Sequence, residues 1–295
     1  MFDVRPVFNV IGLLVSCLGL TMLFPFALDL SRGNGHSGVF LECALITVLT
    51  GGMIYLATRR EEARGLTLQQ TFLLTTGVWV ALPLFGALPF VLGATDASYT
   101  DAFFEAMSGL TTTGATVFSG LDYLPDGLLL WRSILQWLGG IGIIVVAMVF
   151  LPELRVGGMQ IFRSEGFDTF GKILPRATEI AAQIAWLYVA LTAACAVVYI
   201  ASGMRSFDAV LHAMTTIATG GFSSYDASFV RFGAATEYAC VLFMCLAALP
   251  FVRYVQLING QPSSLFKDTQ VRMFFIILMV AVGFLTAVLW AEPFP

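Results

Sequence analysis

One fourteen-residue pattern occurs twice in this chain, each time between two long apolar runs. Residues 101–114 read DAFFEAMSGLTTTG and residues 208–221 read DAVLHAMTTIATGG, with six of fourteen positions identical in an ungapped alignment. Average residue usage would give about one identity by chance. Both segments are too short and too polar to cross a bilayer. The repeat therefore predicts two short helices, each followed by a Thr/Gly-rich segment that turns back at membrane depth.

The composition places the chain in a bilayer. Of its 295 residues, 58% are hydrophobic and 12% are charged, and the mean hydropathy is +0.86. A soluble domain has about 25% charged residues. The net charge of −4 argues against nucleic acid as a partner. Because the sequence contains no phosphate-binding glycine motif, no Ser/His/Asp set and no metal-binding pair of histidines, we expect a protein that is not an enzyme.

Apolar stretches of about 20 residues mark the expected membrane spans. We expect seven, at residues 7–30, 39–58, 68–93, 128–152, 178–202, 234–252 and 272–291. The predicted fold is an all-α polytopic membrane protein built from repeated units of membrane helix, pore helix, filter segment and membrane helix. Its expected parts are a two-helix preface at 1–65, a first unit at 66–155, a second unit at 156–262 and the first span of a third unit at 263–295.

The distribution of Lys and Arg predicts which side of the membrane each loop occupies. Most of them lie in three connections that alternate correctly to share one side, at residues 59–66, 153–176 and 253–271. No Lys or Arg occurs between residues 93 and 131, a stretch that holds five acidic residues. We therefore expect the amino terminus and the three basic loops in the cytoplasm of a bacterial cell. Both repeated segments then enter the inner membrane from outside.

The residues that end each repeat suit a monovalent cation. Leu110 to Thr116 leave the first short helix and Ile217 to Phe222 leave the second. Threonine supplies a carbonyl and a hydroxyl oxygen, and glycine permits backbone angles that turn successive carbonyls to one side. The carboxyl end of a short helix is the negative pole of its dipole and favours a cation. Each copy therefore predicts about one quarter of a filter in which ringed carbonyls replace a hydration shell.

Several polar residues in and near the repeats have a structural interpretation beside a functional one. Thr/Gly-rich segments also serve close packing of membrane helices, although a second aligned copy favours a filter. Asp101 and Asp208 fit helix caps better than ion ligands. Glu105 aligns with His212, so we expect neither to belong to a shared site, and His212 to be hydrogen-bonded within its helix. Arg132 is expected to extend its charge to the membrane surface.

Other small residues are interpreted as packing elements. Gly139, Gly140 and Gly142 are expected to form helix contacts, and Pro250 is expected to kink its span. The five cysteines lie in apolar runs without the spacing of metal ligands, and we interpret them as small membrane hydrophobes.

Three segments carry a resemblance to a known family. Residues 103–116 read FFEAMSGLTTTGAT, residues 137–144 read WLGGIGII and residues 156–160 read VGGMQ. Together they closely resemble the Trk-type potassium-uptake membrane subunits of the Trk/Ktr/HKT superfamily. Residues 219–223, TGGFS, are similar to that family's second filter segment. The resemblance covers the entire chain, and its first filter region is highly specific.

The resemblance implies four membrane–pore–membrane units around one potassium pathway. It also implies a homodimer that contacts membrane lipid and binds a cytoplasmic nucleotide-binding regulatory subunit. Potassium, the transported substrate, is expected to enter down its electrochemical gradient or coupled to another ion. Carried over by matching positions, the coordinating groups are the backbone oxygens of Thr112, Thr113, Gly114, Thr219, Gly220 and Gly221.

The chain contains two of the about four filter segments that a carbonyl ring around one ion requires. The third and fourth filter segments of the family and its intramembrane gating loop are not in the sequence. We therefore expect this chain to need the other half of the ring in order to conduct. The alternative function is a non-conducting membrane fragment that acts only by association with other subunits.

Overall fold

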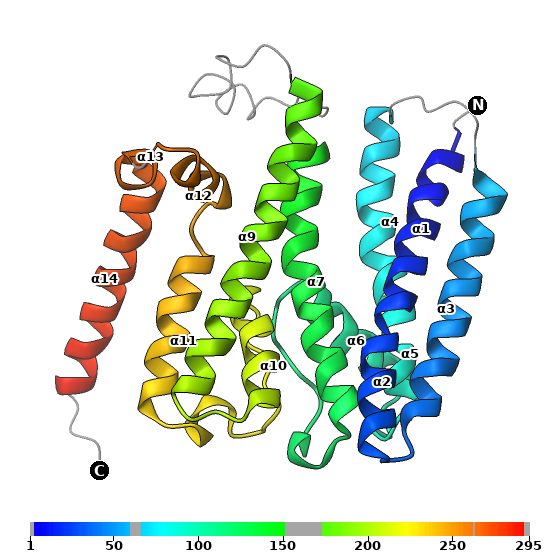
Figure 1. Ribbon diagram of the computed structural model, residues 1–295, viewed down its shortest axis with the longest axis horizontal. Coiled ribbons are helices and arrows are strands. Elements are labelled where there is room, and N and C mark those ends of the chain that lie inside the picture. The colour runs from blue at the N-terminus through cyan, green and yellow to red at the C-terminus, as the bar shows by residue number, and fades with distance from the viewer. Residues whose placement is uncertain (1–2, 60–65, 151–172, 262, 292–295) are drawn as a thin grey trace.

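The computed structural model describes residues 3–59, 66–150, 173–261 and 263–291, which form helices joined by turns (Figure 1). The helices up to the middle of the chain are α1 (Arg5–Thr21), α2 (Leu23–Arg32), α3 (Ser37–Thr58), α4 (Leu68–Gly86), α5 (Leu88–Leu92), α6 (Tyr99–Leu110), η1 (Leu121–Tyr123) and α7 (Asp126–Phe150). Those that follow are α9 (Ile173–Ala201), α10 (Ser206–Ile217), η3 (Ser228–Arg231), α11 (Ala234–Ala247), α12 (Phe251–Ile258), α13 (Ser263–Lys267) and α14 (Thr269–Ala291).

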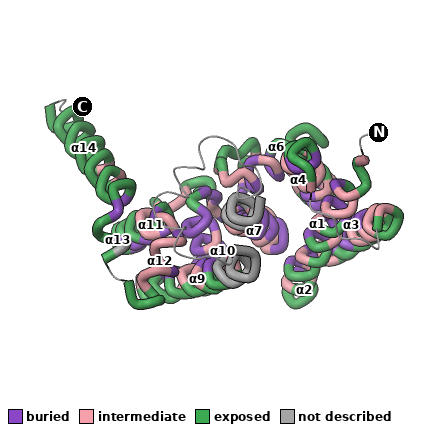
Figure 2. The backbone as a smooth tube through the Cα atoms, turned by 90° about the horizontal axis from the view of Figure 1, so that it is seen from above, coloured by how far each residue is buried: buried purple, intermediate pink, exposed green. Residues whose placement is uncertain are grey.

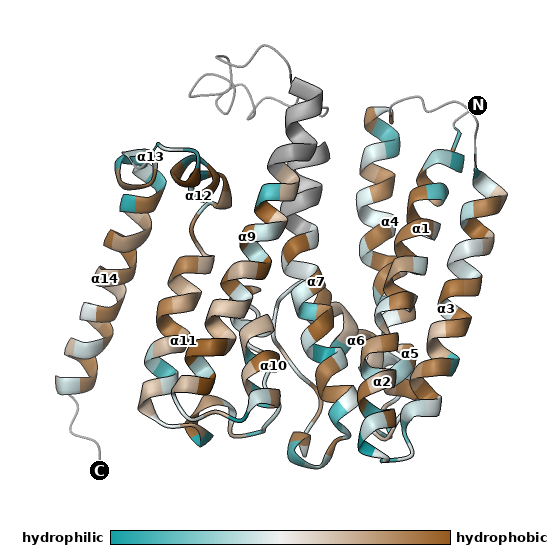
Figure 3. Ribbon diagram, in the orientation of Figure 1, coloured by the Kyte–Doolittle hydropathy of each residue, from teal (hydrophilic) through white to brown (hydrophobic). Residues whose placement is uncertain are grey.

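Most of the expected membrane spans are helices of sufficient length and hydropathy. Within the described residues, α1 with α2, α3, α4 with α5, α9 and α14 each satisfy that test, and Figure 3 shows them mostly brown, the colour of apolar residues. The expected span at 128–152 coincides with α7 as far as residue 150, the last residue of that helix. The span at 234–252 is a pair of helices, α11 and α12, bent by 83° at a break that contains Pro250. The kink expected at Pro250 is confirmed.

Local sequence explains where several helices begin and end. Thr67 and Gln70 form a reciprocal capping box at the start of α4, which satisfies two backbone donors. Gly33 ends α2 with a φ of 64°, an angle that suits glycine at this position. The buried carboxylate of Asp29 on α2 accepts a hydrogen bond of 2.9 Å from the backbone amide of Gly127, in the first turn of α7. That contact fixes the two-helix preface against the helix that follows the first repeated segment.

Two apolar cores flank α7. One core lies between the preface helices and α6, and its buried members on α6 are Ala102, Ala106 and Leu110. The other lies between α9 and α11, and it includes Ala209 and Ala213 of α10. α7 reaches into both, through Trp131 on one side and the half-buried Trp137 on the other. Figure 2 shows the resulting concentration of buried residues around α7 and α10.

The helix ends lie at two opposite edges of the molecule. Successive connections alternate between these edges, as the distribution of basic residues predicts. Figure 1 shows the amino terminus, the beginning of α4 and helices α12 and α13 at one edge, whereas α6 and α10 lie toward the opposite edge. Most of the first two basic connections, at 60–65 and 151–172, lies outside the described residues. The division between the first and second units at residue 155 lies there too.

α14 stands apart from the rest of the molecule. Its most apolar stretch of 18 residues has no buried residue, and Figure 2 shows it as an exposed helix at one end. Asp268 caps it by accepting from the amides of Gln270 and Val271. Burial raises the pKa of the Asp268 carboxyl, but these donors and the side chain of Arg253 outweigh burial and hold it below its ordinary value. Asp268 is therefore ionised at neutral pH and anchors α14 to α12.

Candidate ion-filter site

The two repeated segments form pore helices of equal length. α6 and α10 each contain 12 residues and begin 107 positions apart, the offset of the sequence repeat. Ser98 caps α6 through its hydroxyl, which accepts from the amide of Asp101 and donates to its carboxylate. Asp101 thus supports the cap from the first turn without being the cap itself. The prediction for Asp208 is wrong, because Arg205 occupies the cap position and buried Asp208 binds side chains of the following loop.

Each pore helix ends in a turn with the same unusual backbone. Thr112 and Thr219 have φ angles of 54° and 53°, and Gly114 and Gly221 have φ angles of 78° and 80°. Positive φ is rare for a β-branched residue and costs on the order of 1–3 kcal/mol. Both pairs are separated by 107 positions, so the strain recurs at matching sites. Such strain persists only where the surrounding structure holds it, and it concentrates at functional sites.

Hydrogen bonds close the two turns in the same order. The donor and acceptor residues are Thr111–Met107, Thr112–Gly109 and Thr113–Ser108 in the first copy, and Ala218–Met214, Thr219–Thr216 and Gly220–Thr215 in the second. Each donor is a backbone amide and each acceptor is a carbonyl at the end of the pore helix. These bonds satisfy carbonyls at the end of each pore helix. Because the same backbone bonds form in both copies, the two turns have the same geometry although their side chains differ.

The two turns touch each other. A Cβ atom placed on Gly114 would lie 1.8 Å from the carbonyl oxygen of Gly220, which only a residue without a side chain tolerates. A Cβ on Gly221 would meet nothing within 4 Å. The structure therefore brings the first and second filter segments, predicted from sequence, into direct backbone contact. The two glycines are needed for different reasons. Gly114 permits the close approach of the Gly220 carbonyl, whereas Gly221 permits only the positive φ angle.

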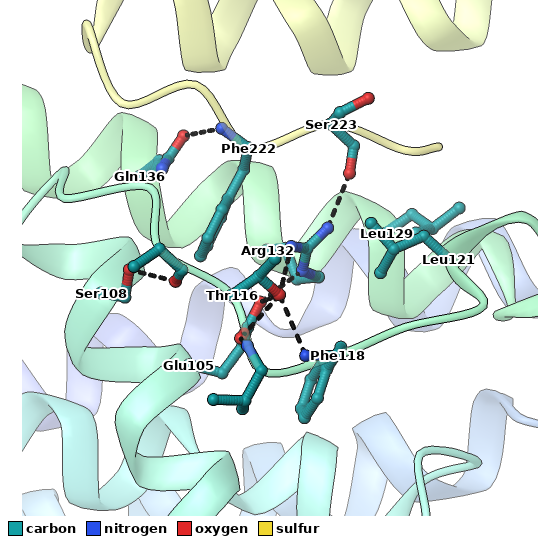
Figure 4. A network of polar contacts seen from close by, with 12 residues as sticks. Glu105, Ser108, Thr116, Phe118, Leu121, Leu129, Arg132, Gln136, Phe222 and Ser223 are labelled. Atoms are coloured by element: carbon teal, nitrogen blue, oxygen red, sulfur yellow. Dashed lines mark hydrogen bonds and ion pairs between the residues drawn. The ribbon is translucent and has the colours of Figure 1, made fainter. Parts of the chain in front are cut away.

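A buried carboxylate holds the first return segment, the residues that leave the turn after Gly114. Glu105 on α6 accepts hydrogen bonds from the hydroxyl of Thr116, at 2.9 and 3.0 Å, and from the amide of Val117, at 3.1 Å (Figure 4). Ser108 also reaches this segment, donating from its hydroxyl to the Ala115 carbonyl at 2.6 Å. The segment is thereby fixed along one side of α6.

A buried histidine holds the second return segment at the matching position. Nε2 of His212 on α10 lies 3.0 Å from the hydroxyl of Ser223, and Nδ1 lies 2.8 Å from the carbonyl oxygen of Asp208. Since a carbonyl only accepts, Nδ1 carries a proton. Ser223 follows Thr116 by 107 positions, so residues 105 and 212 perform the same task. Each residue braces its own return segment, and the expected hydrogen bonding of His212 within its helix is confirmed.

Arg132 on α7 joins both return segments. Its Nε lies 2.8 Å from Glu105, one terminal nitrogen donates to the carbonyl of Ser223 at 2.7 Å, and the other donates to the hydroxyl of Thr116 at 3.2 Å. The guanidinium also lies 4.2 Å from the centre of the Phe222 ring. The side chain is 1% exposed, so the prediction that it extends to the membrane surface is wrong. An acidic partner at bonding distance allows this charge to stay inside the protein.

One turn further along α7, Gln136 faces the filter turns. Its side-chain oxygen accepts from the amide of Phe222 at 3.1 Å. A Cβ on Gly139 would lie 2.0 Å from the Leu110 carbonyl oxygen, and one on Gly140 would lie 3.1 Å from Ala218. These two glycines let α7 approach the carboxyl ends of both pore helices, so their predicted role in helix contacts is confirmed. A Cβ on Gly142 would meet nothing within 4 Å among the described residues, which show no helix contact there.

A polar clasp connects the loops beyond the two return segments. The carboxylate of Asp226 accepts from the amides of Gly120 and Leu121 at 2.8 and 3.1 Å, and Arg231 pairs with Asp122 at 2.9 Å. Between this clasp and the turns lies a cavity of about 240 Å³, bordered by both Gly114 and Gly221.

The sequence pointed to the turns and missed the residues that hold them. Thr112, Thr113 and Gly114 lie in the first turn, and Thr219, Gly220 and Gly221 lie in the second. The sequence pattern predicts a surface position for Arg132 and does not single out Gln136. A usable signal existed, because an ionisable residue in an apolar helix normally has a buried partner. Glu105 was an acid available in the adjacent apolar segment.

Two short pore helices, two strained turns and a bracing helix between them define a helical membrane protein built from pore-helix units. Comparison with known proteins agrees with this class. Residues 36–292 match the family model of the TrkH cation transport proteins, so the chain belongs to that family. It is 40% identical to the Trk system potassium uptake protein TrkH of Halomonas elongata over 98% of this chain. It is 38% identical to the TrkH protein of Escherichia coli K12 over 97% of this chain.

A solved structure supports the same relationship. The crystal structure of the potassium transporter TrkH from Vibrio parahaemolyticus aligns with 95% of this chain at 35% identity and a TM-score of 0.83. The alignments cover 61% of the Halomonas protein, 60% of the Escherichia coli protein and 57% of the solved chain. The present chain thus spans about three fifths of the length of these relatives. The family that it belongs to is one of cation transport proteins and not of enzymes.

Proposed function

We propose that this chain lines a pathway for potassium ions across the membrane. The observation that carries the proposal is the pair of matching strained turns in backbone contact, at the carboxyl ends of two pore helices. The groups proposed to coordinate the ion are the backbone oxygens of Thr112, Thr113, Gly114, Thr219, Gly220 and Gly221.

The chemistry of the turns suits a potassium ion. Residues 111–116 and 218–223 contain no charged side chain, so the available ligands are neutral oxygens. Neutral carbonyls can replace the hydration shell of a monovalent cation without binding it too tightly for release. The carboxyl end of each pore helix adds the negative end of its dipole. Relatives named for potassium uptake support potassium as the ion and uptake as the direction. The membrane potential contributes about 2.3 kcal/mol per charge per 100 mV to inward movement.

The two turns are proposed to be two of about four contributors to one coordinating ring. The remaining contributors come from further membrane segments, in a homodimer or in another chain. A role by association alone is the second candidate function, and the bare apolar surface of α14 favours it. Such a surface gains packing contacts when other helices cover it. A cytoplasmic nucleotide-binding subunit is a further proposed partner, supported by the family resemblance.

We also propose the inner membrane of a bacterium as the location, with the amino terminus in the cytoplasm. The distribution of Lys and Arg supports this orientation. A cysteine introduced at Arg59 of a variant without native cysteines should resist a membrane-impermeant reagent in intact cells, and one introduced at Asp122 should react. The opposite pattern would reverse the orientation.

A chimaera tests the proposed function. This chain replaces the aligned part of the Vibrio parahaemolyticus transporter, and the product is expressed in bacteria that lack their own potassium uptake. The chimaera should restore growth and rubidium uptake at low external potassium, in preference to sodium. A chimaera that reaches the membrane in normal amount and moves neither ion would contradict the proposal. This chain alone in liposomes is the companion measurement, and it should move little potassium because half of the ring is missing.

A further inference from the structure

We infer that Arg132 is a positioning residue that sets the placement of the first filter segment relative to the second, and through it the selectivity for potassium. The selectivity part of this inference rests on the proposed function, whereas the structural part does not. Arg132 is the guanidinium within the described residues that contacts the return segments of both repeats. It does so from α7, which packs against both pore helices.

The contacts to the first unit involve charge. Nε of Arg132 binds Glu105 at 2.8 Å, and a terminal nitrogen binds the hydroxyl of Thr116 at 3.2 Å. That hydroxyl donates in turn to Glu105. The carboxylate, the hydroxyl and the guanidinium therefore form a closed triangle behind the first turn, visible in Figure 4. A closed set of charge-assisted hydrogen bonds fixes geometry more firmly than a single contact.

The contacts to the second unit are to its backbone and to an aromatic face. The other terminal nitrogen of Arg132 donates to the Ser223 carbonyl at 2.7 Å, and the guanidinium lies over the ring of Phe222. Phe222 directly follows Gly221, the last residue of the second filter segment. A shift of Arg132 therefore moves the chain immediately next to that segment.

Gln136 extends the same helix face toward the turns. It follows Arg132 by four residues, which places both on one side of α7. Its oxygen binds the Phe222 amide, while its amide nitrogen is buried without a hydrogen-bond partner in the described residues. A Cβ on Gly114 would lie 3.7 Å from that nitrogen. Gln136 is thus wedged between the two turns, and Arg132 fixes the spacing behind it.

A simpler role for Arg132 is neutralisation of Glu105. Lysine distinguishes the two roles, because it carries the same charge but lacks the planar fork that makes several directed hydrogen bonds at once. If neutralisation were the whole role, Arg132→Lys would behave like the parent chain. If positioning is the role, the variant should fold but lose the link to Ser223 and the stacking on Phe222.

Hydrogen exchange of the full chain in detergent micelles measures the structural part. Arg132→Lys should raise amide exchange by about tenfold in residues 113–117 and also in residues 220–224, the factor for one lost hydrogen bond to a charged group. The matched control is Arg32→Lys, since Arg32 pairs with Asp126 at 3.1 Å on the surface. The control should leave both segments unchanged.

Uptake by the chimaera described above measures the selectivity part. Arg132→Lys should lower the ratio of potassium to sodium uptake by about tenfold at unchanged abundance. If Arg132→Lys reduces the amount of folded chain, Glu105→Gln/Arg132→Gln replaces it, because that pair leaves no unpaired buried charge. The double variant must deprotect both segments as well.

The exchange experiment tests the positioning role, and the uptake experiment tests the role in selectivity. Faster exchange confined to residues 113–117, or in neither segment, would overturn the joint positioning role. Faster exchange in both segments with an unchanged uptake ratio would overturn the role in selectivity. If the parent chimaera moves no potassium while both segments respond to Arg132→Lys, the proposed function fails and the positioning role stands.

Discussion

In the first repeat a buried ion pair holds the return segment behind the turn, whereas in the second repeat a histidine without an ion-pair partner in the described residues does so. Glu105 and His212 occupy matching positions, and each binds the matching hydroxyl residue, Thr116 or Ser223. The turns in front of them agree in φ to within about two degrees. The comparison shows that the backbone of this site is fixed more tightly than the side chains that support it. It also shows that the ionic support of the first repeat comes from a third helix, α7, through Arg132.

The largest expected effect comes from breaking the charged brace. Glu105→Ala leaves Arg132 buried without its partner, and we expect the free energy of unfolding to fall by about 3–5 kcal/mol. Unfolding in mixed micelles, followed by tryptophan fluorescence, measures this change. Asp101→Ala on the same pore helix is the control, because Asp101 is exposed. A loss below about 1 kcal/mol for Glu105→Ala would mean that the brace is dispensable.

Alanine at the two matching glycines separates contact from conformation. Gly114→Ala adds a Cβ that collides with the Gly220 carbonyl, whereas Gly221→Ala adds one in open space. Both variants suffer the cost of positive φ, on the order of 1–2 kcal/mol. Gly114→Ala should therefore lose more stability and more potassium selectivity than Gly221→Ala, measured by unfolding and by uptake of the chimaera. Equal losses would show that the turns do not touch in the membrane.

Removing the histidine brace should cost less than removing the ion-paired one. His212→Phe keeps a ring against Phe229 and Phe232 but loses the hydrogen bonds to Ser223 and to the carbonyl of Asp208. Two neutral hydrogen bonds contribute about 2 kcal/mol. The unfolding assay should show a loss near that value, and hydrogen exchange should rise in residues 220–224 alone. A loss as large as that of Glu105→Ala would erase the distinction between the repeats.

The ion pair of the polar clasp should contribute least to stability. Arg231 and Asp122 pair at 2.9 Å, but the Arg231 side chain is 54% exposed. Exposed pairs are typically worth 0–1 kcal/mol, and salt screens them further. Arg231→Ala should therefore change the free energy of unfolding by less than about 1 kcal/mol, with the difference vanishing at high salt. A larger, salt-independent loss would assign the clasp a structural role that the geometry does not indicate.

The sequence predicted what depends on repetition and hydropathy. An ungapped repeat between apolar runs located both pore helices and both turns, and the position of Pro250 located the bend between α11 and α12. The sequence did not predict contacts between elements that are distant in the chain. The charge of Arg132 was visible, but its pairing with Glu105 depends on how α7 packs against α6. The same holds for Asp208, whose partners lie in a loop that folds back over the helix start.

The position of the bound ion distinguishes the repeated turns from other membrane segments as the filter. Crystals of the chimaera grown with thallium, a potassium substitute that scatters anomalously, show where the cation binds. We expect an anomalous peak beside the backbone oxygens of residues 112–114 and 219–221, which weakens when potassium is added. A chimaera that transports potassium but has no peak along these two segments would contradict the assignment of the repeated turns as the filter.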